Sequence, residues 1–359
     1  MAVYNVSGTE LNALYDVESE SIYHAYDVEG TEVFGGQVPP VQPMDWTNIP
    51  TQYRTNIASA MSYANTYLNS HSNAFMFPVL TDVHDKFYNE PNYLLYNFSN
   101  KFDKFLFLGD IANEYSQTEM DNAKAYIQQA SSVDVLALVG NHELSTWAEG
   151  DDLPKDWYQP LVPSSAVVMS ETDALVYYFD DTTNNIRFIV LDSCTPIYKS
   201  AGTQLLTKNE LEFFASALDM VGGRDVLLLN HAPGQYYYRV AEPETGESTT
   251  TVTNRATMDS IINAYINKTS VTLTDDASVS HTHDYSEATG RFIGLVAGHT
   301  HRAGYTNSNG YNVLICPSSY YNDSGMSIFI VDPDAKKIIW LIAYKSLTSI
   351  GTYEYTYGT

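Results

Sequence analysis

From about residue 50 onward, segments with helical spacing of apolar residues alternate with short runs of consecutive apolar residues. Helical spacing occurs at 52–68, 118–130 and 255–266, and apolar residues three or four positions apart predict a helix with one buried face. Another helix is predicted after a capping-box pattern, Thr-Lys-Asn-Glu, at 207–210. The apolar runs, which predict buried strands, lie at 75–80, 105–108, 135–139, 186–191, 226–229 and 292–297. This alternation predicts an α/β fold built from βαβ units.

The first part of the chain has a different pattern. Tyr-Asp-Val-Glu occurs at 15–18 and again at 26–29, and three prolines follow between 39 and 43. Short repeating units with turn residues favour small β-hairpins or an extended segment. We therefore predict an acidic arm with a proline-rich linker at 1–50 and one larger domain at 51–359. An acidic tail without fixed structure is the alternative for the arm.

Charge and composition narrow the classes of protein to which this chain can belong. Its 43 acidic and 18 basic residues give a formal net charge of −25, and a negative field repels polyanions. Broad binding to nucleic acid or anionic membranes is therefore not expected. No apolar run approaches the roughly 20 residues that cross a bilayer, and no basic segment followed by an apolar one opens the chain. We expect a soluble protein without a signal peptide or a transmembrane segment.

Side chains that bind metals lie directly after five of the predicted buried strands. Because the carboxyl ends of strands in an open α/β sheet converge on one crevice, these side chains are expected to meet there. One such residue after one strand is weak evidence, since isolated histidines are usually structural. Five groups in order are far more specific. The residues are Asp82 and His84, Asp110, Asn141 and His142, His231, and finally His299 and His301.

These residue types suit a pair of divalent ions. Imidazole together with carboxylate favours zinc, manganese or iron, whereas a set of oxygen ligands alone would favour magnesium or calcium. In Asp-x-His and His-x-His, two side chains are expected on the same side of an extended segment. The carboxylate of Asp110 can bridge two ions roughly 3.5–4 Å apart, and such a pair lowers the pKa of a bridging water and presents hydroxide for in-line attack on phosphorus.

The whole series resembles the motifs of the calcineurin-like metallophosphoesterases, over roughly residues 75 to 345. The motifs are Asp82-Val83-His84, Gly109-Asp110, Gly140-Asn141-His142-Glu143, Asn230-His231 and Gly298-His299-Thr300-His301. The resemblance implies a four-layer αββα sandwich and a hydrolase that acts on phosphoesters. Our hypothesis is a phosphodiesterase rather than a monoesterase.

The resemblance also implies a role for each matching residue. One ion, expected to be manganese, iron or zinc, would be held by Asp82, His84 and His301. A second would be held by Asn141, His231 and His299, with Asp110 bridging the two. His142 would not bind metal but would stabilise the transition state and protonate the leaving oxygen.

The chain departs from the family pattern at Asn113. Many members have a second aspartate three residues after the bridging one, and in some it orients the catalytic histidine. Asn113 stands at this position, and its amide oxygen can accept a hydrogen bond without supplying a negative charge. We expect His142 to be a weaker acid catalyst, suited to good leaving groups, or to take its partner from elsewhere.

Several further residues have two interpretations. Arg302 is a candidate for binding substrate phosphate or a solvated surface charge. Tyr236 and Arg239, which follow the His231 segment, are candidates for lining the substrate cleft or for a packed insertion. The pair His281 and His283 repeats the His-x-His spacing, but it lies in a polar stretch, so an exposed loop is predicted.

The arm loosely resembles short leader modules on phage or prophage tail-associated proteins of Gram-positive bacteria. This resemblance implies a virion component that contacts other tail proteins through residues 1–50 and acts outside the cell. Wall polymers linked by phosphodiesters, such as teichoic acids, would then be substrates. A nucleotide or phospholipid phosphodiesterase is one alternative. A structural or binding virion protein that keeps the fold with little turnover is another.

Overall fold

The computed structural model describes residues 3–4, 10–11, 25–26, 32–34, 46–146, 152–168, 175–194, 203–234, 237–240, 246–247, 251–275, 277–320 and 325–358. The chain divides into two compact units, Met1–Asn48 and Ile49–Thr359. In the first unit, β1 (Val3–Tyr4) pairs with β2 (Glu10–Leu11), and β3 (Ala25–Tyr26) pairs with β4 (Glu32–Phe34), both antiparallel. The first copy of the repeat, at 15–18, lies outside the described residues.

The second unit contains two large sheets. The six-stranded sheet has the order β23-β22-β21-β5-β6-β7. Its strands β5, β6 and β7 are parallel, and the three from the end of the chain are antiparallel to their neighbours. The bounds are β5 (Phe75–Leu80), β6 (Lys104–Leu108), β7 (Asp134–Leu138), β21 (Gly325–Asp332), β22 (Lys337–Tyr344) and β23 (Gly351–Thr356).

The nine-stranded sheet has the order β14-β13-β19-β20-β18-β12-β10-β9-β8. Strands β10, β12, β18 and β20 form its parallel centre. The bounds are β8 (Val167–Val168), β9 (Tyr177–Asp181), β10 (Ile186–Val190), β12 (Asp225–Asn230), β13 (Tyr237–Arg239), β14 (Gly246–Glu247), β18 (Phe292–Ala297), β19 (Gly304–Thr306) and β20 (Val313–Ile315). Two small sheets pair β11 (Thr203–Leu205) with β15 (Thr251–Thr253), and β16 (Ser270–Thr274) with β17 (Ser280–Asp284).

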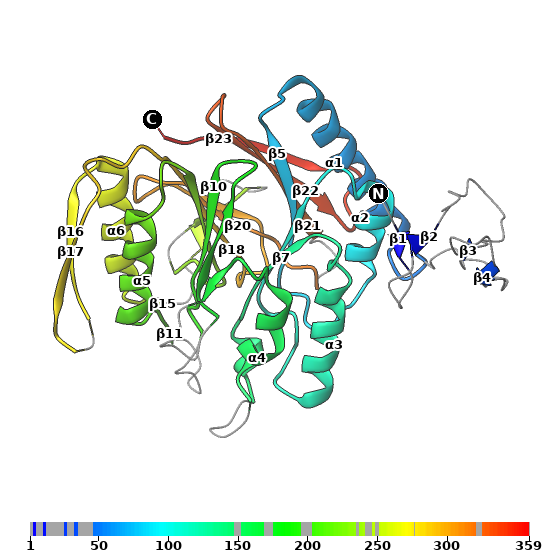
Figure 1. Cartoon of the computed structure of the whole chain (residues 1–359), viewed down its shortest axis with the longest axis horizontal. Coiled ribbons are helices and arrows are strands. Elements are labelled where there is room, and N and C mark those ends of the chain that lie inside the picture. The colour runs from blue at the N-terminus through cyan, green and yellow to red at the C-terminus, as the bar shows by residue number, and fades with distance from the viewer. Residues whose placement is uncertain are drawn as a thin grey trace. The chain divides into compact units, whose positions relative to one another are not determined.

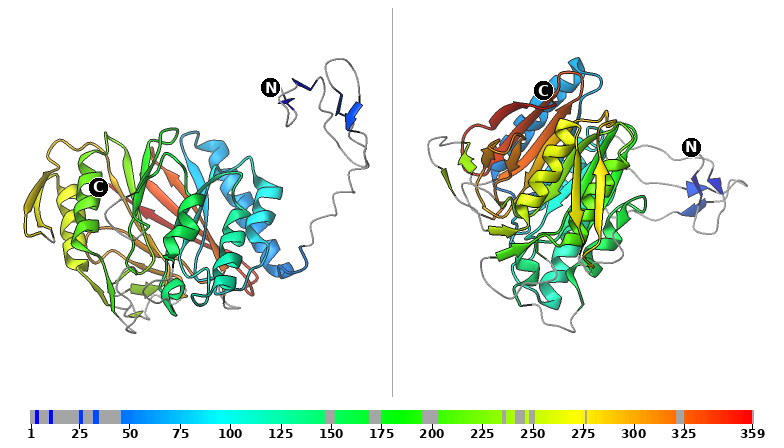
Figure 2. Two further views of the ribbon diagram at one scale, coloured as in Figure 1. Left: turned by 60° about the horizontal axis from the view of Figure 1, so that its bottom comes forward. Right: turned by 90° about the vertical axis from the view of Figure 1, so that its left-hand side faces the viewer.

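The two large sheets face each other, and helices cover their outer faces (Figures 1 and 2). Phe77 of β5 meets Phe188 of β10 edge to face, with ring centroids 5.5 Å apart, so side chains of both sheets share one core. Helices α1 (Thr51–Ser70), α2 (Glu90–Phe98) and α3 (Gln117–Gln128) lie on the six-stranded side, and α5 (Lys208–Asp219) and α6 (Arg255–Asn267) on the nine-stranded side. The predicted four-layer αββα sandwich is therefore confirmed.

Local sequence explains where several of these elements begin. The apolar runs of β5, β6, β12 and β18 are buried along their whole length, as expected for strands covered on both faces. Helix α5 begins at the predicted capping box, in which Thr207 and Glu210 each accept a main-chain N–H of the other. Among the described helices, none is both long and apolar enough to cross a membrane.

The prediction for His281 and His283 was wrong. Both lie in strand β17, which pairs with β16 over five residues, and His283 is only 6% exposed. The segment is polar because its partners are polar. The strand is mostly exposed, with only His283 buried, and the ring of His283 contacts Asp219 and Glu212 on helix α5, so polar contacts take the place of the apolar run that marks strands buried on both faces.

Shorter helical turns complete the large unit. They are η1 (His142–Leu144), α4 (Pro154–Tyr158) and η2 (Gln159–Leu161). The turn η1 follows the end of β7 after three intervening residues and carries His142, so the chain passes from β7 into the region where the candidate ligands meet.

Candidate metal centre

The candidate ligands follow the carboxyl ends of β5, β6, β7, β12 and β18, as predicted, but most of them do not lie in extended backbone. Five have positive φ angles, a conformation that non-glycine residues seldom adopt. They are Asp82 (50°), His84 (47°), Asp110 (52°), His299 (72°) and His301 (62°). The expectation that Asp-x-His and His-x-His form extended segments was therefore wrong, because each strand ends before its ligands and the chain turns there.

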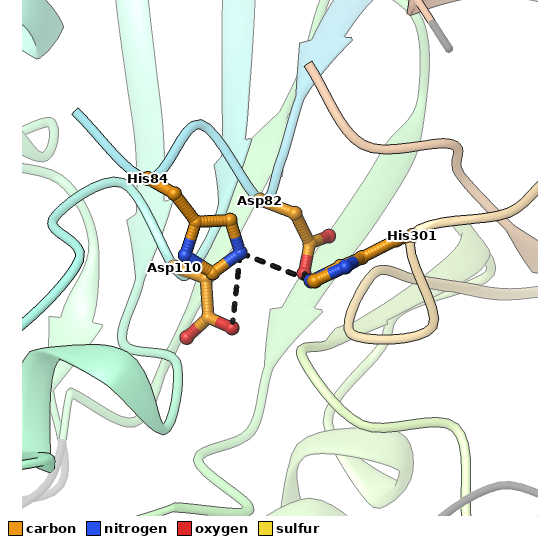
Figure 3. A group of neighbouring side chains, drawn as sticks. All are labelled: Asp82, His84, Asp110 and His301. Carbon is orange, nitrogen blue, oxygen red and sulfur yellow. Dashed lines mark hydrogen bonds and ion pairs between the residues drawn. The ribbon is translucent and has the colours of Figure 1, made fainter. Parts of the chain in front are cut away.

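One group of side chains gathers around Asp82, His84, Asp110 and His301 (Figure 3). His84 Nε2 lies 3.0 Å from His301 Nε2 and 4.0 Å from Oδ2 of Asp110. His301 Nε2 also lies 3.3 Å from Oδ1 of Asp82. Two imidazole nitrogens this close either share one proton or face one cation. With two carboxylates beside them, the group can hold a divalent ion.

A second group gathers around Asp110, His231 and His299. His231 Nε2 lies 3.2 Å from Oδ2 of Asp110, and His299 Nδ1 lies 3.3 Å from His231 Nε2. The amide oxygen of Asn141 is 2.8 Å from His299 Nδ1 and 3.2 Å from His231 Nε2. The two groups share Asp110, so the structure brings together all seven residues that the sequence suggested as ligands.

The donor atoms of these groups fit metal ions. Oδ2 of Asp110, which faces both groups, is buried and makes no hydrogen bond of acceptable geometry to the residues that the structure describes, although His231 Nε2 lies 3.2 Å away, and buried polar atoms are seldom left this way. His231 Nδ1 lies 2.7 Å from the main-chain oxygen of Leu108. Because a carbonyl can only accept, Nδ1 carries the hydrogen and Nε2 is left for a metal, as is common for histidine ligands.

Burial and mutual charge set the protonation of the histidines. Burial lowers the pKa of His84 to about 4, against an opposing effect of Asp110. Burial and the neighbouring His231 lower the pKa of His299 to about 4, so both rings are neutral at pH 7 and have lone pairs to donate. Burial alone would lower the pKa of His231, but Asp110 raises it to about 10, so without an ion its Nε2 also carries a proton at pH 7, which a bound metal would displace. Burial also opposes ionisation of Asp110, yet His231 outweighs it and lowers the pKa of that carboxyl group.

His142 lies beside the centre and does not belong to either group. Its ring meets that of His84 edge to face, with centroids 4.4 Å apart, and its main-chain N–H donates to Oδ1 of Asp110. His142 Nδ1 lies 2.7 Å from the main-chain oxygen of Asn113. The partner of His142 is thus the backbone of Asn113, not the amide side chain that the sequence suggested.

Glu143 is a residue of the site whose role the sequence analysis missed. It is fully buried, and its carboxylate accepts main-chain N–H groups of Asp110, Ile111, Ala112 and Gly140 at 2.6–2.9 Å. One side chain therefore joins the loop after β6, which carries Asp110, to the end of β7. The available signal was a carboxylate four residues after the apolar run at 135–139.

Two glycines allow the loops after β6 and β7 to approach closely. A Cβ atom on Gly140 would lie 2.2 Å from Oδ1 of Asp110. Gly109 has a φ of 80°, and a Cβ there would lie 2.6 Å from the main-chain nitrogen of Gly140. Gly109, before Asp110, is therefore required by space as well as by backbone conformation, and Gly140, before Asn141, by space.

The three predicted substrate-binding residues lie in different surroundings or outside the described residues. Arg302 is exposed next to His301. Arg239 lies in β13 and forms an ion pair with Glu247, which favours a structural role. Tyr236 lies outside the described residues.

Two residues that the sequence did not suggest lie near His84. The ring of Tyr320 meets His84 edge to face, with centroids 5.5 Å apart. The ammonium of Lys86 lies 5.5 Å from the centroid of that tyrosine ring. They add an aromatic side chain and a cation on the His84 side of the centre.

Comparison with known proteins agrees with this geometry. A model of the calcineurin-like phosphoesterase family matches residues 77–303, which is more than half of the chain. The chain belongs to this family, whose members normally use two divalent metal ions. No curated protein sequence gives a significant match.

Solved structures resemble the fold at low sequence identity. A purple acid phosphatase from yellow lupin (Lupinus luteus) is 12% identical with a TM-score of 0.50, and the match covers 78% of this chain and 53% of that one. A putative 5'-nucleotidase from Staphylococcus aureus is 15% identical with a TM-score of 0.41, covering 79% of this chain and 54% of that one. This chain spans about half the length of both proteins. At 12% identity the likeness to the purple acid phosphatase concerns the fold alone.

Proposed function

We propose that the chain hydrolyses phosphodiesters at a dinuclear centre formed by Asp82, His84, Asp110, Asn141, His231, His299 and His301. The observation that carries this proposal is the pair of ligand groups that share Asp110. When bound, two divalent ions supply Lewis acidity and a hydroxide nucleophile for attack at phosphorus.

The protein side chains position the reacting groups and supply a proton to the leaving oxygen. Asp110 holds the two groups together, and its Oδ1 accepts the main-chain N–H of His142. This contact places His142 at the edge of the centre, where its Nε2 can donate a proton to the leaving oxygen. The hydrogen bond from Nδ1 to the carbonyl of Asn113 fixes the ring orientation. Unlike a carboxylate, this carbonyl supplies no negative charge to stabilise the protonated imidazole.

Charge favours a diester over a monoester. A monoester is largely a dianion at neutral pH, whereas a diester has one negative charge. The chain has a net charge of −25. A field of this sign opposes the approach of the dianion more strongly.

The test is hydrolysis of bis-(p-nitrophenyl) phosphate and of p-nitrophenyl phosphate with added manganese. We expect the diester to give the higher kcat/KM. His142→Ala should lower kcat on the diester by roughly 100-fold or more, while His71→Ala, at the end of α1 and outside both ligand groups, should leave it unchanged. Equal rates for the His142 and His71 variants would refute the role of His142, and a preference for the monoester would refute the diester assignment.

The natural substrate and the context of the chain are further parts of the proposal. We infer that the arm, the compact unit Met1–Asn48, attaches the enzyme to other phage-tail proteins and that cell-wall phosphodiesters such as teichoic acids are the substrate. A panel of wall teichoic acid, cyclic and linear nucleotides and glycerophosphodiesters, each with several metals, tests the substrate. Genes for tail proteins beside this gene would support the context, and a preference for nucleotides or phospholipids would contradict it.

A further inference from the structure

The hairpin of β16 and β17 has two histidines that take no part in the centre described above. His281 pairs with Leu273 and His283 with Val271 across the hairpin. Alternate residues of a strand share a face, so both imidazoles lie on one side. That side faces helix α5, because a side chain of α5 approaches both rings, and Figures 1 and 2 show the hairpin alongside α5 and α6.

Each of these imidazoles has one ring nitrogen beside an aspartate. His283 Nδ1 lies 2.5 Å from Oδ2 of Asp219, the last residue of α5. His281 Nε2 lies 3.3 Å from Oδ2 of Asp275, in the hairpin turn. Histidines that bind metals usually donate their second ring N–H to a carboxylate or carbonyl, which orients the ring and raises its basicity. Both rings have this arrangement.

The other nitrogen of each ring approaches a single carboxylate oxygen. Oε1 of Glu212 lies 2.9 Å from His283 Nε2 and 3.9 Å from His281 Nδ1. Two donors bound to one zinc ion at roughly 2.0–2.1 Å are about 3–3.4 Å apart, so these distances lie on either side of that spacing. The second oxygen of Glu212, Oε2, is buried and has no hydrogen-bond partner among the described residues.

We propose that His281, His283 and Glu212 form an additional site for one divalent transition-metal ion of the zinc type. Two imidazole nitrogens and a carboxylate oxygen suit zinc, nickel or copper, whereas calcium and magnesium prefer oxygen alone. The ring of His283 is buried between helix and hairpin, while the side chain of His281 is 41% exposed. His281 therefore has room to turn its Nδ1 toward the ion, and a fourth position is left for water.

An ion at this site would join the hairpin to helix α5. Its ligands come from β17 and from α5, and β16 and β17 form a two-stranded sheet of their own. A two-stranded hairpin is marginally stable alone. Because the ion would bind only when hairpin and helix are together, it would oppose opening of the hairpin by mass action.

A network of ion pairs without metal is the competing explanation. A doubly protonated His283 would donate to Asp219 and Glu212 at once, which also accounts for the two short contacts. This explanation requires no ion. It therefore predicts that added zinc does not bind at the hairpin and does not change the dynamics of the hairpin.

Zinc content distinguishes the two explanations. The whole chain is equilibrated with zinc chloride, separated from free zinc by gel filtration, and assayed for zinc and protein. We expect the double variant His281→Asn, Glu212→Gln to hold one ion fewer per chain than the unsubstituted protein. The control His71→Asn changes a histidine outside the cluster and should retain the full number. Equal zinc content in the double variant and the unsubstituted protein overturns the proposal.

Hydrogen exchange supplies a second readout and verifies folding. Zinc should slow amide exchange in β16 and β17 by about tenfold or more at saturating concentration in the unsubstituted protein, and should not do so in the double variant. Exchange in β5 and β12 should be alike in both proteins if the variant is folded. Unchanged exchange of the hairpin on adding zinc to the unsubstituted protein contradicts the proposal. Both readouts are differences between proteins with the same dinuclear centre, so they do not depend on phosphoesterase activity.

Discussion

The two His-x-His pairs of this molecule differ in backbone conformation. His299 and His301 lie after the end of β18 with φ angles of 72° and 62°, whereas His281 and His283 are alternate residues of the regular strand β17. Their surroundings differ as well. The first pair meets candidate ligands from four other strand ends, and the second meets carboxylates from one helix and one turn.

The difference shows how each site is prepared for an ion. A non-glycine residue in the left-handed region costs on the order of 1 kcal/mol, and five candidate ligands of the dinuclear centre adopt it. Such a backbone persists only where surrounding contacts fix it, as Glu143 does for the loop of Asp110. The dinuclear centre is therefore built before metal binds, while the hairpin pair needs a turn of His281.

The largest effect should come from removing the residue that the two ligand groups share. Asp110→Asn replaces the common carboxylate by an amide, so we expect kcat/KM for the diester to fall by roughly 1000-fold or more. The variant should hold less metal at the centre and still hold the hairpin ion. The double variant His281→Asn, Glu212→Gln should keep full activity and the metal of the centre but lose the hairpin ion. Activity and metal analysis of both variants measure this, and parallel losses in the two would show that the sites are not independent.

The next largest effect should come from the clamp that holds the loop of Asp110. Glu143→Gln leaves one acceptor oxygen and adds an NH2 group facing main-chain donors, so the free energy of unfolding should fall by about 2–3 kcal/mol. Metal affinity at the centre should fall by roughly 10–100-fold. Urea denaturation and metal titration measure the two quantities. Glu114→Gln, an exposed site on the adjoining loop, is the matched control. Identical behaviour of the two variants would mean that Glu143 is not needed to hold the loop of Asp110.

Changes of pH should act on a buried carboxyl group that belongs neither to the metal centre nor to the hairpin. Burial raises the pKa of Glu90, at the start of α2, to about 7, although Lys345 opposes this. Between pH 4.5 and 7 the folded chain then binds more protons at this residue than the unfolded chain does. Its contribution to the free energy of unfolding should therefore fall as pH rises through this range, by on the order of 3 kcal/mol.

Glu90→Gln tests this dependence. The unfolding free energy of the variant minus that of the unsubstituted protein, measured in urea at pH 4.5, 5.5 and 7, should increase as pH rises. Tyr126, which donates to Oε2 of Glu90, can still donate to the amide oxygen. A constant difference between the two proteins across this range would contradict the assignment.

The smallest effect is expected at Asn113. Because His142 bonds to the main-chain oxygen of this residue, Asn113→Asp retains the contact, and the exposed carboxylate acts on the imidazole only through solvent. We expect kcat to change by less than about twofold, with little movement of the pH profile. A large rise in rate would show that the side chain can replace the backbone as the partner of His142.

Sequence reasoning located the strands and the candidate ligands because both have local signals. A strand buried on both faces is a continuous apolar run, and β5, β6 and β18 match their predictions closely. The left-handed backbone of Asp82 and His301 has no such signal, because it is imposed by contacts between loops that are distant in the chain.

Strand β17 and Glu143 were missed for the same reason. In β17 only His283 is buried, against carboxylates from α5, and the acceptor role of Glu143 depends on main-chain groups over thirty residues away. Patterns within a segment cannot report partners that only the tertiary structure supplies. The separation of the arm from the large unit, in contrast, coincides with a change of composition that the sequence displays directly.

The pairing of β5 with β21 has a consequence for how the chain is made. Val79 pairs with Ser327 and Phe77 with Phe329, so β5 leaves the ribosome long before its neighbour in the sheet exists. Until then its edge, which consists of apolar residues with unpaired main-chain groups, is open to other chains. Contacts this distant in sequence also slow folding. During synthesis the nascent chain should therefore depend on chaperones that cover strand edges, and its yield should respond to their supply more than to the presence of metal.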